Sequence, residues 1–228
     1  MIRTLFFMLF PVLLFSQSNF EKGERYFLEN NYEEAKKVFE KELKSTNYYY
    51  QVIEYLGDIS CGLQDWDTGI KYFEILKDKF PNKANYHYKY GGALGMKAKS
   101  VNKFAALRMI DDVEASFLKA TELDKKHIES RWALVIFYVE IPAIIGGSEK
   151  KSQRFANELM AISKVDGYLA KGYIDVYFER YNNALVNFMN AHKIGNSKTT
   201  FQKLYDLLLN KMGDKSKAEE LKKEFNKI

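Results

Sequence analysis

Glycine recurs at a fixed interval in the first half of the chain. Gly23, Gly57 and Gly91 are spaced 34 residues apart, and each is followed by an apolar pattern that indicates two helices joined by a turn. A period of this length indicates a helical repeat, in which one hairpin cannot bury its apolar face alone and must stack on its neighbours. The chain is therefore predicted to be an all-α solenoid.

The second repeat shows the internal pattern most clearly. One known helical repeat of 34 residues, in which the glycine is position 8, has small or aromatic residues at positions 8, 11, 20, 24 and 27 and a helix breaker near position 32, and the chain is similar to this pattern. In this repeat, positions 8, 20, 24, 27 and 32 are Gly57, Gly69, Phe73, Leu76 and Pro81, and Leu56 and Trp66 add apolar residues at positions 7 and 17. Small residues let the two helices of a hairpin approach closely, and the aromatic rings fill the gaps beside the crossing.

The first and fifth repeats also fit, through Gly23, Ala35 and Phe39 and through Gly172, Ala184 and Phe188. The third and fourth repeats contain insertions, residues 97–110 and 142–147. The first of these contains no Pro or Gly, so we expect the helix before it to run on or restart there. Pro142 is expected to end its helix at the preceding residue, because the residue before a proline is disfavoured in the helical region. The sixth repeat ends in a strongly charged helix, which is typical of a terminal repeat facing water.

On these positions the chain resembles a tetratricopeptide repeat (TPR) protein over nearly all of its length after residue 16. The resemblance implies a right-handed superhelical solenoid of about six helix-turn-helix repeats. The expected hairpins are roughly residues 17–49, 50–83, 84–125, 126–164, 165–198 and 199–228. The family further implies binding of a protein or peptide in the concave groove, without catalysis.

Residues 1–16 have the pattern of a secretory signal peptide. Arg3 precedes an apolar run from Leu5 to Phe15, and Ser16 and Gln17 follow. As a helix, a run of about 11 residues would span about 16 Å, roughly half the hydrocarbon core of a bilayer. We therefore expect an exported protein, most simply periplasmic and otherwise secreted, with the TPR domain at residues 17–228. An uncleaved segment that anchors the protein to the membrane is the alternative.

Composition and motifs argue against several other functions. With 35 basic and 30 acidic residues the net charge is only +5, which indicates a mixed surface and no nucleic-acid partner. Cys61 is the single cysteine, so the chain has no internal disulfide and no thiolate zinc cluster. The histidines lack the spacing of metal ligands, and no pair of acids is distinguished as a general acid and base. We therefore expect no enzyme activity, no metal and no cofactor.

The resemblance also implies which residues face a partner. In the TPR fold the first helix of each hairpin lines the concave face through positions 2, 5, 9, 12 and 13. The candidates are Phe20, Glu24, Phe27, Glu54, Asp58, Tyr88, Phe137, Tyr138, Tyr173, Val176 and Tyr177. The predicted groove is acidic near its start and aromatic in its second half, although any single ring has packing against a neighbouring hairpin as its alternative. The acids at its start would repel the C-terminal carboxylate that some TPR domains clamp.

Two functions remain open. The first is an exported scaffold that holds a protein or peptide; the second is a structural accessory of envelope assembly, anchored by an uncleaved N-terminal helix. Membrane contact is expected only if that segment is retained.

Neighbouring hairpins place equivalent turns on the same edge, so the two insertions are expected to form one ridge, either as a contact surface or as a cover for apolar side chains. The basic run of this ridge is interpreted as a solvated face, with lipid headgroups or a partner as alternatives; it comprises Lys97, Lys99, Lys103 and Arg108.

Overall fold

The computed structural model describes residues 19–43 and 48–225, and every regular element within these ranges is a helix. The all-α prediction is confirmed for this part of the chain. The predicted signal peptide, residues 1–16, lies outside the described residues. Of the helices in the described ranges, none is both long and apolar enough to cross a bilayer. The described residues form two compact units that meet between Asp65 and Trp66 in the sequence, called here the N-terminal and C-terminal units.

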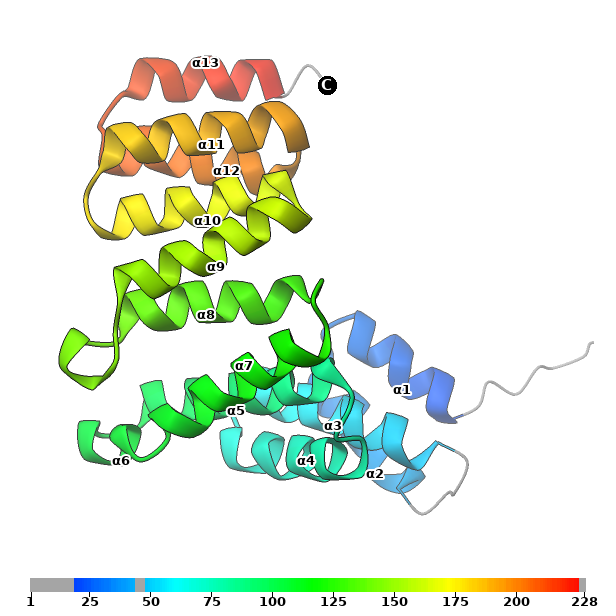
Figure 1. Cartoon of the computed structure of the whole chain (residues 1–228). Helices are drawn as coiled ribbons and strands as arrows, with labels where there is room; N and C mark the ends of the chain where they lie inside the picture. The colour runs from blue at the N-terminus through cyan, green and yellow to red at the C-terminus, as the bar shows by residue number, and fades with distance from the viewer. Residues whose placement is uncertain (1–18, 44–47, 226–228) are drawn as a thin grey trace, which may run out of the picture. The chain divides into compact units, whose positions relative to one another are not determined.

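The N-terminal unit contains three helices. They are α1 (Asn19–Leu28), α2 (Tyr32–Glu42) and α3 (Tyr49–Gly62), drawn in blue to cyan in Figure 1. At the turn between α1 and α2, Asn30 has a φ of 58°, a left-handed conformation that asparagine tolerates better than most residues. A Cβ atom on Gly23 would lie 2.8 Å from the ring of Phe39, which is fully buried. Glycine therefore allows α1 to pack closely against that ring.

The C-terminal unit is a stack of successive helices, drawn from cyan through green and yellow to red in Figure 1. Each α-helix from α7 onward packs against the next one, as expected of hairpins that share a core. The elements are α4 (Trp66–Lys79), α5 (Ala84–Ser100), α6 (Lys103–Leu107), α7 (Ile110–Leu123), α8 (Ile128–Glu140), η1 (Ala143–Ile145), α9 (Glu149–Ile162), α10 (Lys164–Tyr177), α11 (Tyr181–Gly195), α12 (Lys198–Asp206), η2 (Leu207–Lys211) and α13 (Lys215–Phe225).

The two insertions form short helices. In the first insertion, α5 ends at Ser100 and the chain restarts as α6, where the side chain of Asn102 accepts a hydrogen bond from the backbone N–H of Ala105 at 3.0 Å. In the second, α8 ends at Glu140 and Pro142 precedes the single turn η1. The first insertion therefore restarts as a new helix, which is one of the two expected outcomes, and α8 ends before Pro142 as expected.

Candidate functional site: a groove across α8, α10 and α12

One cavity of about 560 Å³ lies along the C-terminal unit. Side chains from α8, α10 and α12, the first helices of three consecutive hairpins, form most of its wall, and η2 closes one end. The lining residues are Trp132, Ile136, Asp166, Leu169, Tyr173, Val176, Phe188, Thr199, Lys203, Asp206, Leu207, Asn210 and Lys211. The cavity thus has an apolar and aromatic part on α8 and α10 and a charged part on α12 and η2.

The repeat positions explain why these residues share one surface. With Gly172 as position 8 of the fifth repeat, positions 2, 5, 9 and 12 are Asp166, Leu169, Tyr173 and Val176, and all four line the cavity. With Ala218 as position 20 of the sixth repeat, positions 5, 9, 12 and 13 are Lys203, Leu207, Asn210 and Lys211, which line it as well. The cavity is therefore built by the positions that line the concave face in the TPR pattern.

Hydrogen bonds fix the aromatic part of the groove. The indole Nε1 of Trp132 donates to Asp166 Oδ1 at 2.9 Å, and the hydroxyl of Ser163 donates to the other oxygen of that carboxylate at 2.5 Å. The hydroxyl of Tyr173 donates to Glu140 Oε1 at 2.9 Å. Burial, and then this hydrogen bond, raise the pKa of Tyr173, so the ring stays neutral. These side chains are held in place before any partner arrives.

The charged part of the groove is exposed and rests on an unusual turn. Lys203, Asp206, Asn210 and Lys211 are all exposed. Among the described residues, neither Lys203 nor Lys211 forms an ion pair. Residues of η2 form a π-helical turn, in which the N–H of Met212 donates to the carbonyl of Leu207 at 2.9 Å. Such turns occur often at functional sites.

Two of the predicted groove residues in α8 are core residues instead. Phe137 is 8% exposed and Tyr138 is 3% exposed, and both belong to the main apolar core of the C-terminal unit. Phe137 and Tyr138 would be groove positions 12 and 13 of the fourth repeat if Ala133 held position 8, the glycine position. In the structure Tyr138 itself holds position 8, and its ring stacks on that of Phe155 at a centroid distance of 5.9 Å. This part of the prediction is therefore corrected: Trp132 and Ile136 are the groove residues of α8.

Other predicted residues of the C-terminal unit divide between groove and packing. Tyr173 and Val176 line the groove, and Tyr177 follows them at the end of α10 with 48% of its surface exposed. Tyr88 is half-buried, and its ring centroid lies 6.1 Å from that of Phe117 and 5.4 Å from that of His127. Tyr88 therefore follows the alternative prediction, in which a ring packs against neighbouring side chains instead of facing the groove.

The structure brings the predicted residues of α1 together in the N-terminal unit. The rings of Phe20 and Phe27 lie 5.9 Å and 5.1 Å from the ring of Tyr55, whose hydroxyl donates to Glu24 Oε1 at 2.8 Å. Burial, and then the bond to Glu24, raise the pKa of Tyr55 to about 12. Glu54 and Asp58 lie on α3 and are half-buried. The α1 candidates thus form a cluster around one tyrosine of α3.

Sequence reasoning missed Trp132, Leu169 and the whole contribution of the sixth repeat. The signal was nevertheless present in the chain. Trp132 and Asp166 are 34 residues apart, as are Leu169 and Lys203 and also Val176 and Asn210. Applying the same interval to every groove position, rather than to the glycines alone, would have found these residues.

Comparison with known proteins supports the fold. No protein-family model matches the sequence, and neither does any curated protein. Among solved structures, the TPR protein TTC0263 of Thermus thermophilus is similar with a TM-score of 0.68 and 13% identity, over 84% of this chain and 97% of that one. The type IV pilus biogenesis factor PilW is similar with a TM-score of 0.65 and 14% identity, over 90% of both chains.

A third similar structure is the human IFIT1 dimer with m7Gppp-AAAA. Its TM-score is 0.70 and its identity 16%, over 92% of this chain, which spans about half (51%) of the IFIT1 chain. Identities this low speak for the fold alone. The helices, the repeat positions and these similarities agree, and the chain has the fold of a tetratricopeptide-repeat solenoid.

Proposed function

We propose that this protein is an exported scaffold that binds a segment of a partner protein along the groove of α8, α10 and α12. The observation that carries the proposal is the continuity of this groove: the concave-face positions of three consecutive repeats form one cavity, with apolar rings at one end and two unpaired lysines at the other. The TPR fold, which commonly serves as an interaction scaffold, supports the same function.

The lining indicates the kind of segment that fits. Trp132, Leu169 and Tyr173 offer apolar surface that is already ordered, so a partner side chain gains contact area without a large loss of side-chain entropy. Lys203 and Lys211 favour a negative charge near the η2 end. The best ligand is therefore a peptide segment with apolar side chains followed or preceded by acidic ones.

The proposal contains no catalytic step. The two titratable groups in the aromatic part of the groove are both engaged, Asp166 with Trp132 and Ser163, and Tyr173 with Glu140. A group that must transfer a proton to or from a substrate needs that hydrogen-bonding capacity for the substrate. The arrangement supports holding a ligand rather than reacting with it.

The binding proposal is tested by capture from the envelope fraction, followed by mass spectrometry. The double variant Lys203→Glu, Lys211→Glu reverses two exposed charges of the groove without touching the core. Its matched control is Lys222→Glu, Lys223→Glu on α13. We expect about a tenfold or greater loss of the captured partner in the groove variant only. Equal capture by the two variants would show that the groove is not the binding surface.

The same capture experiment distinguishes partner classes. We propose a protein partner and no nucleic acid, since the net charge is small. Because the similar IFIT1 structure contains a capped oligonucleotide, the eluate is also analysed for RNA. RNA that is retained by the wild type and lost in the groove variant would replace the protein partner in this proposal.

Export is a separate part of the proposal. It rests on Arg3 and the apolar run from Leu5 to Phe15. N-terminal sequencing of the protein isolated from cells should give a start near Gln17 or Ser18. A start at Met1 together with recovery in the membrane fraction would favour the alternative function, a membrane-anchored accessory of envelope assembly.

A further inference from the structure

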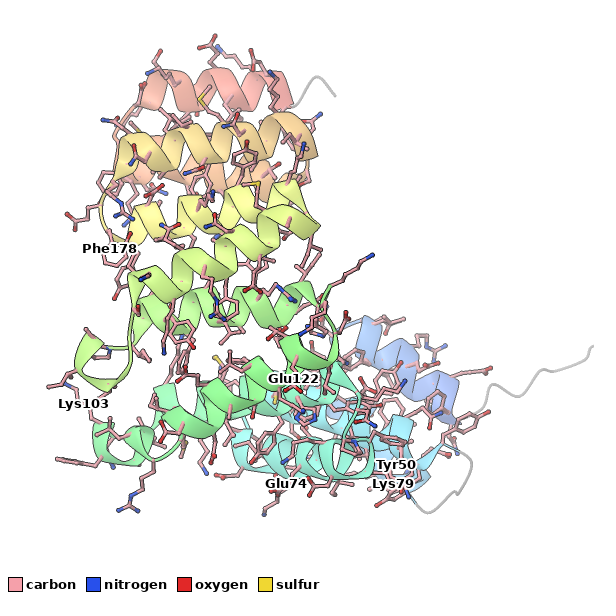
Figure 2. The ribbon with its side chains drawn as sticks, in the orientation of Figure 1. Tyr50, Glu74, Lys79, Lys103, Glu122 and Phe178 are labelled. Atoms are coloured by element: carbon pink, nitrogen blue, oxygen red, sulfur yellow. The ribbon has the colours of Figure 1, made fainter. Side chains whose placement is uncertain are left out.

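The two insertions emerge at one edge of the C-terminal unit. Lys99 Nζ donates to Glu140 Oε2 at 2.5 Å, which joins the end of α5 to the end of α8. The first insertion leaves from α5 and the second from α8. In Figure 1, α6 and the loop between α8 and α9 lie at the same left-hand edge, and Figure 2 labels Lys103 of α6 there. The two insertions therefore emerge at the same edge, as the repeat geometry predicts, and this edge is called the ridge here.

Large apolar side chains project from this ridge. Ile144 on η1 is 94% exposed, Phe104 on α6 is 82% exposed, and Leu107 is 45% exposed. These three residues are called the tip cluster. The alternative in which the insertions cover apolar surface does not describe Phe104 or Ile144, since neither is itself buried. Their exposure makes this edge a candidate contact surface.

The turn that presents Ile144 is conformationally constrained. Gly146 has a φ of 107°, and a Cβ atom on Gly147 would collide with the carbonyl of Ile141. The N–H of Ser148 donates to the carbonyl of Tyr138 at 2.8 Å, and the Ser148 side chain caps α9. The backbone around Ile144 is thus fixed to the core of the fourth repeat, so the side chain is held outward by the fold.

Basic side chains are concentrated in the first insertion, next to Phe104 and Leu107 of the tip cluster. Residues 96–110 contain four basic side chains and no acid, and residues 141–148 contain no charged side chain. Glu140 is paired with Lys99, and Glu149 accepts from Arg180 Nη2 at 2.6 Å, so the two acids next to the second insertion are neutralised. Asp111 and Asp112, in the first turn of α7, directly follow the first insertion and are exposed acids.

Two of the four basic side chains have no acid of their own. Lys97 is paired with Asp67 and Lys99 with Glu140. Lys103 and Arg108 are exposed and form no ion pair among the described residues. Lys103 is the first residue of α6 and Arg108 caps its C-terminal end, so the two cations flank the helix that carries Phe104 and Leu107.

We propose that this edge docks on an anionic lipid surface. Phe104 and Ile144 enter the interfacial region of the bilayer, and Lys103 and Arg108 meet the headgroup phosphates. The form of the tip cluster favours lipid over a protein partner. Its side chains stand on separate tips, whereas a protein partner needs a contiguous surface of complementary shape, and a fluid bilayer accepts single projecting side chains. Such contact does not need residues 1–16 and is independent of the groove.

A local fluorescence reporter tests the proposal in the full chain. Phe104→Trp places a reporter in the tip cluster, and Ile194→Trp is its matched control on α11, where the native side chain is 51% exposed. Trp66 and Trp132 contribute equally to both variants. Vesicles of phosphatidylcholine, with or without phosphatidylglycerol, carry bromine atoms on their acyl chains to quench tryptophan that enters the bilayer.

We expect quenching of the Phe104→Trp protein above that of the Ile194→Trp protein, only on vesicles with phosphatidylglycerol and less at high salt. Adding Lys103→Glu and Arg108→Glu to the reporter should weaken this binding about tenfold or more. Because both reporter proteins carry the N-terminal segment, its own membrane affinity cannot create a difference between them. Equal quenching of the two proteins, or quenching that is independent of lipid charge, would overturn the proposal. Capture of a protein that Phe104→Asp abolishes would overturn it too, in favour of a protein partner.

Discussion

The hairpins α8–α9 and α10–α11 fill the same structural position in opposite ways. In α10, position 8 is Gly172, where a Cβ atom would collide with the ring of Phe188 on α11. In α8, that position is Tyr138, whose ring stacks on Phe155 of α9 with an angle of 9° between the planes. One hairpin therefore leaves room for a ring beneath it, and the other supplies a second ring.

The difference shows that the glycine is one solution to close packing and not a requirement of the repeat. The two helices also present different side chains to the groove. In α10 the groove receives Leu169 and Tyr173, while in α8 it receives Trp132 and Ile136 because Phe137 and Tyr138 point into the core. Trp132 and Asp166 both hold position 2 of their repeats and both line the groove, so the register of the groove is kept although the residue at position 8 differs.

The strongest test of this comparison replaces one tyrosine in each setting. Tyr138→Ala should lower the free energy of unfolding by about 3 kcal/mol or more, because it removes a fully packed ring and leaves a cavity. Tyr173→Ala should cost clearly less, since its ring borders the groove. Urea unfolding followed by circular dichroism measures both changes. Equal losses would mean that the two rings have the same role.

A second test uses two glycines that lie inside helices. Gly172→Ala should destabilise the protein by about 1–3 kcal/mol, since the new methyl group overlaps Phe188. Gly92→Ala is its control, because no atom lies within 4 Å of a Cβ atom built there. The control should stabilise the protein by about 0.5–1 kcal/mol through the unfolded state and helix propensity. Thermal melts would contradict the packing of α10 on α11 if both variants shifted in the same direction.

In the N-terminal unit a single ring, that of Phe39, packs both against a glycine and against a second ring. Phe39 packs against Gly23 of α1 and stacks on Tyr55 of α3 at 4.8 Å. The pKa of Tyr55 is raised to about 12, compared with about 10 in the unfolded chain. Between about pH 10 and pH 12 the unfolded chain releases this proton while the folded chain keeps it, so the stability present below pH 10 is lost as the pH rises through this window.

Urea unfolding at a series of pH values tests whether the free energy of unfolding falls across this window. The wild type should lose stability across that window, and Tyr138 and Tyr173 contribute in the same direction, since burial raises the pKa of each. Tyr55→Phe keeps the ring and removes the titrating group, so its decline with pH should be shallower. An unchanged decline in this variant would show that Tyr55 does not titrate in this range.

The smallest effect is expected on the last helix. Lys222 Nζ lies 4.0 Å from Glu219 Oε1, and both side chains are about half exposed. Water and salt screen such a pair, so Lys222→Ala should change the free energy of unfolding by less than about 0.5 kcal/mol. A larger loss in a urea titration would mean that α13 contributes more to the stack than a terminal cap.

The repeat pattern predicted the fold well because its signals are local. Gly23 and Gly91 lie under aromatic rings from the second helix of their own repeat, and Pro142 lies just after the end of α8, as their sequence context indicates. The groove was predicted only in part. From Gly91 to Tyr138 the count is 47 residues instead of 34, because an insertion intervenes, and a tyrosine holds the expected glycine place. A count based on glycine alone therefore loses the register in α8.

The exposure of the insertions lay beyond such reasoning. Phe104 and Ile144 are apolar, and composition favours burying them. Their exposure follows from the two loops that carry them, one capped by Asn102 and the other bent by Gly146 and Gly147. No repeat position specifies the path of an inserted loop, so only the structure shows where these side chains point.

The π-helical turn at Leu207–Lys211 makes one end of the groove adjustable in evolution. Such a turn contains one residue more than an α-helical turn needs. Loss of a single residue there would restore regular helix and rotate everything after it by about 100°, which carries Lys211 away from the groove while Lys203 keeps its place. Deletion of a single codon would therefore change the charge at this end of the groove while the rest of the solenoid stays as it is.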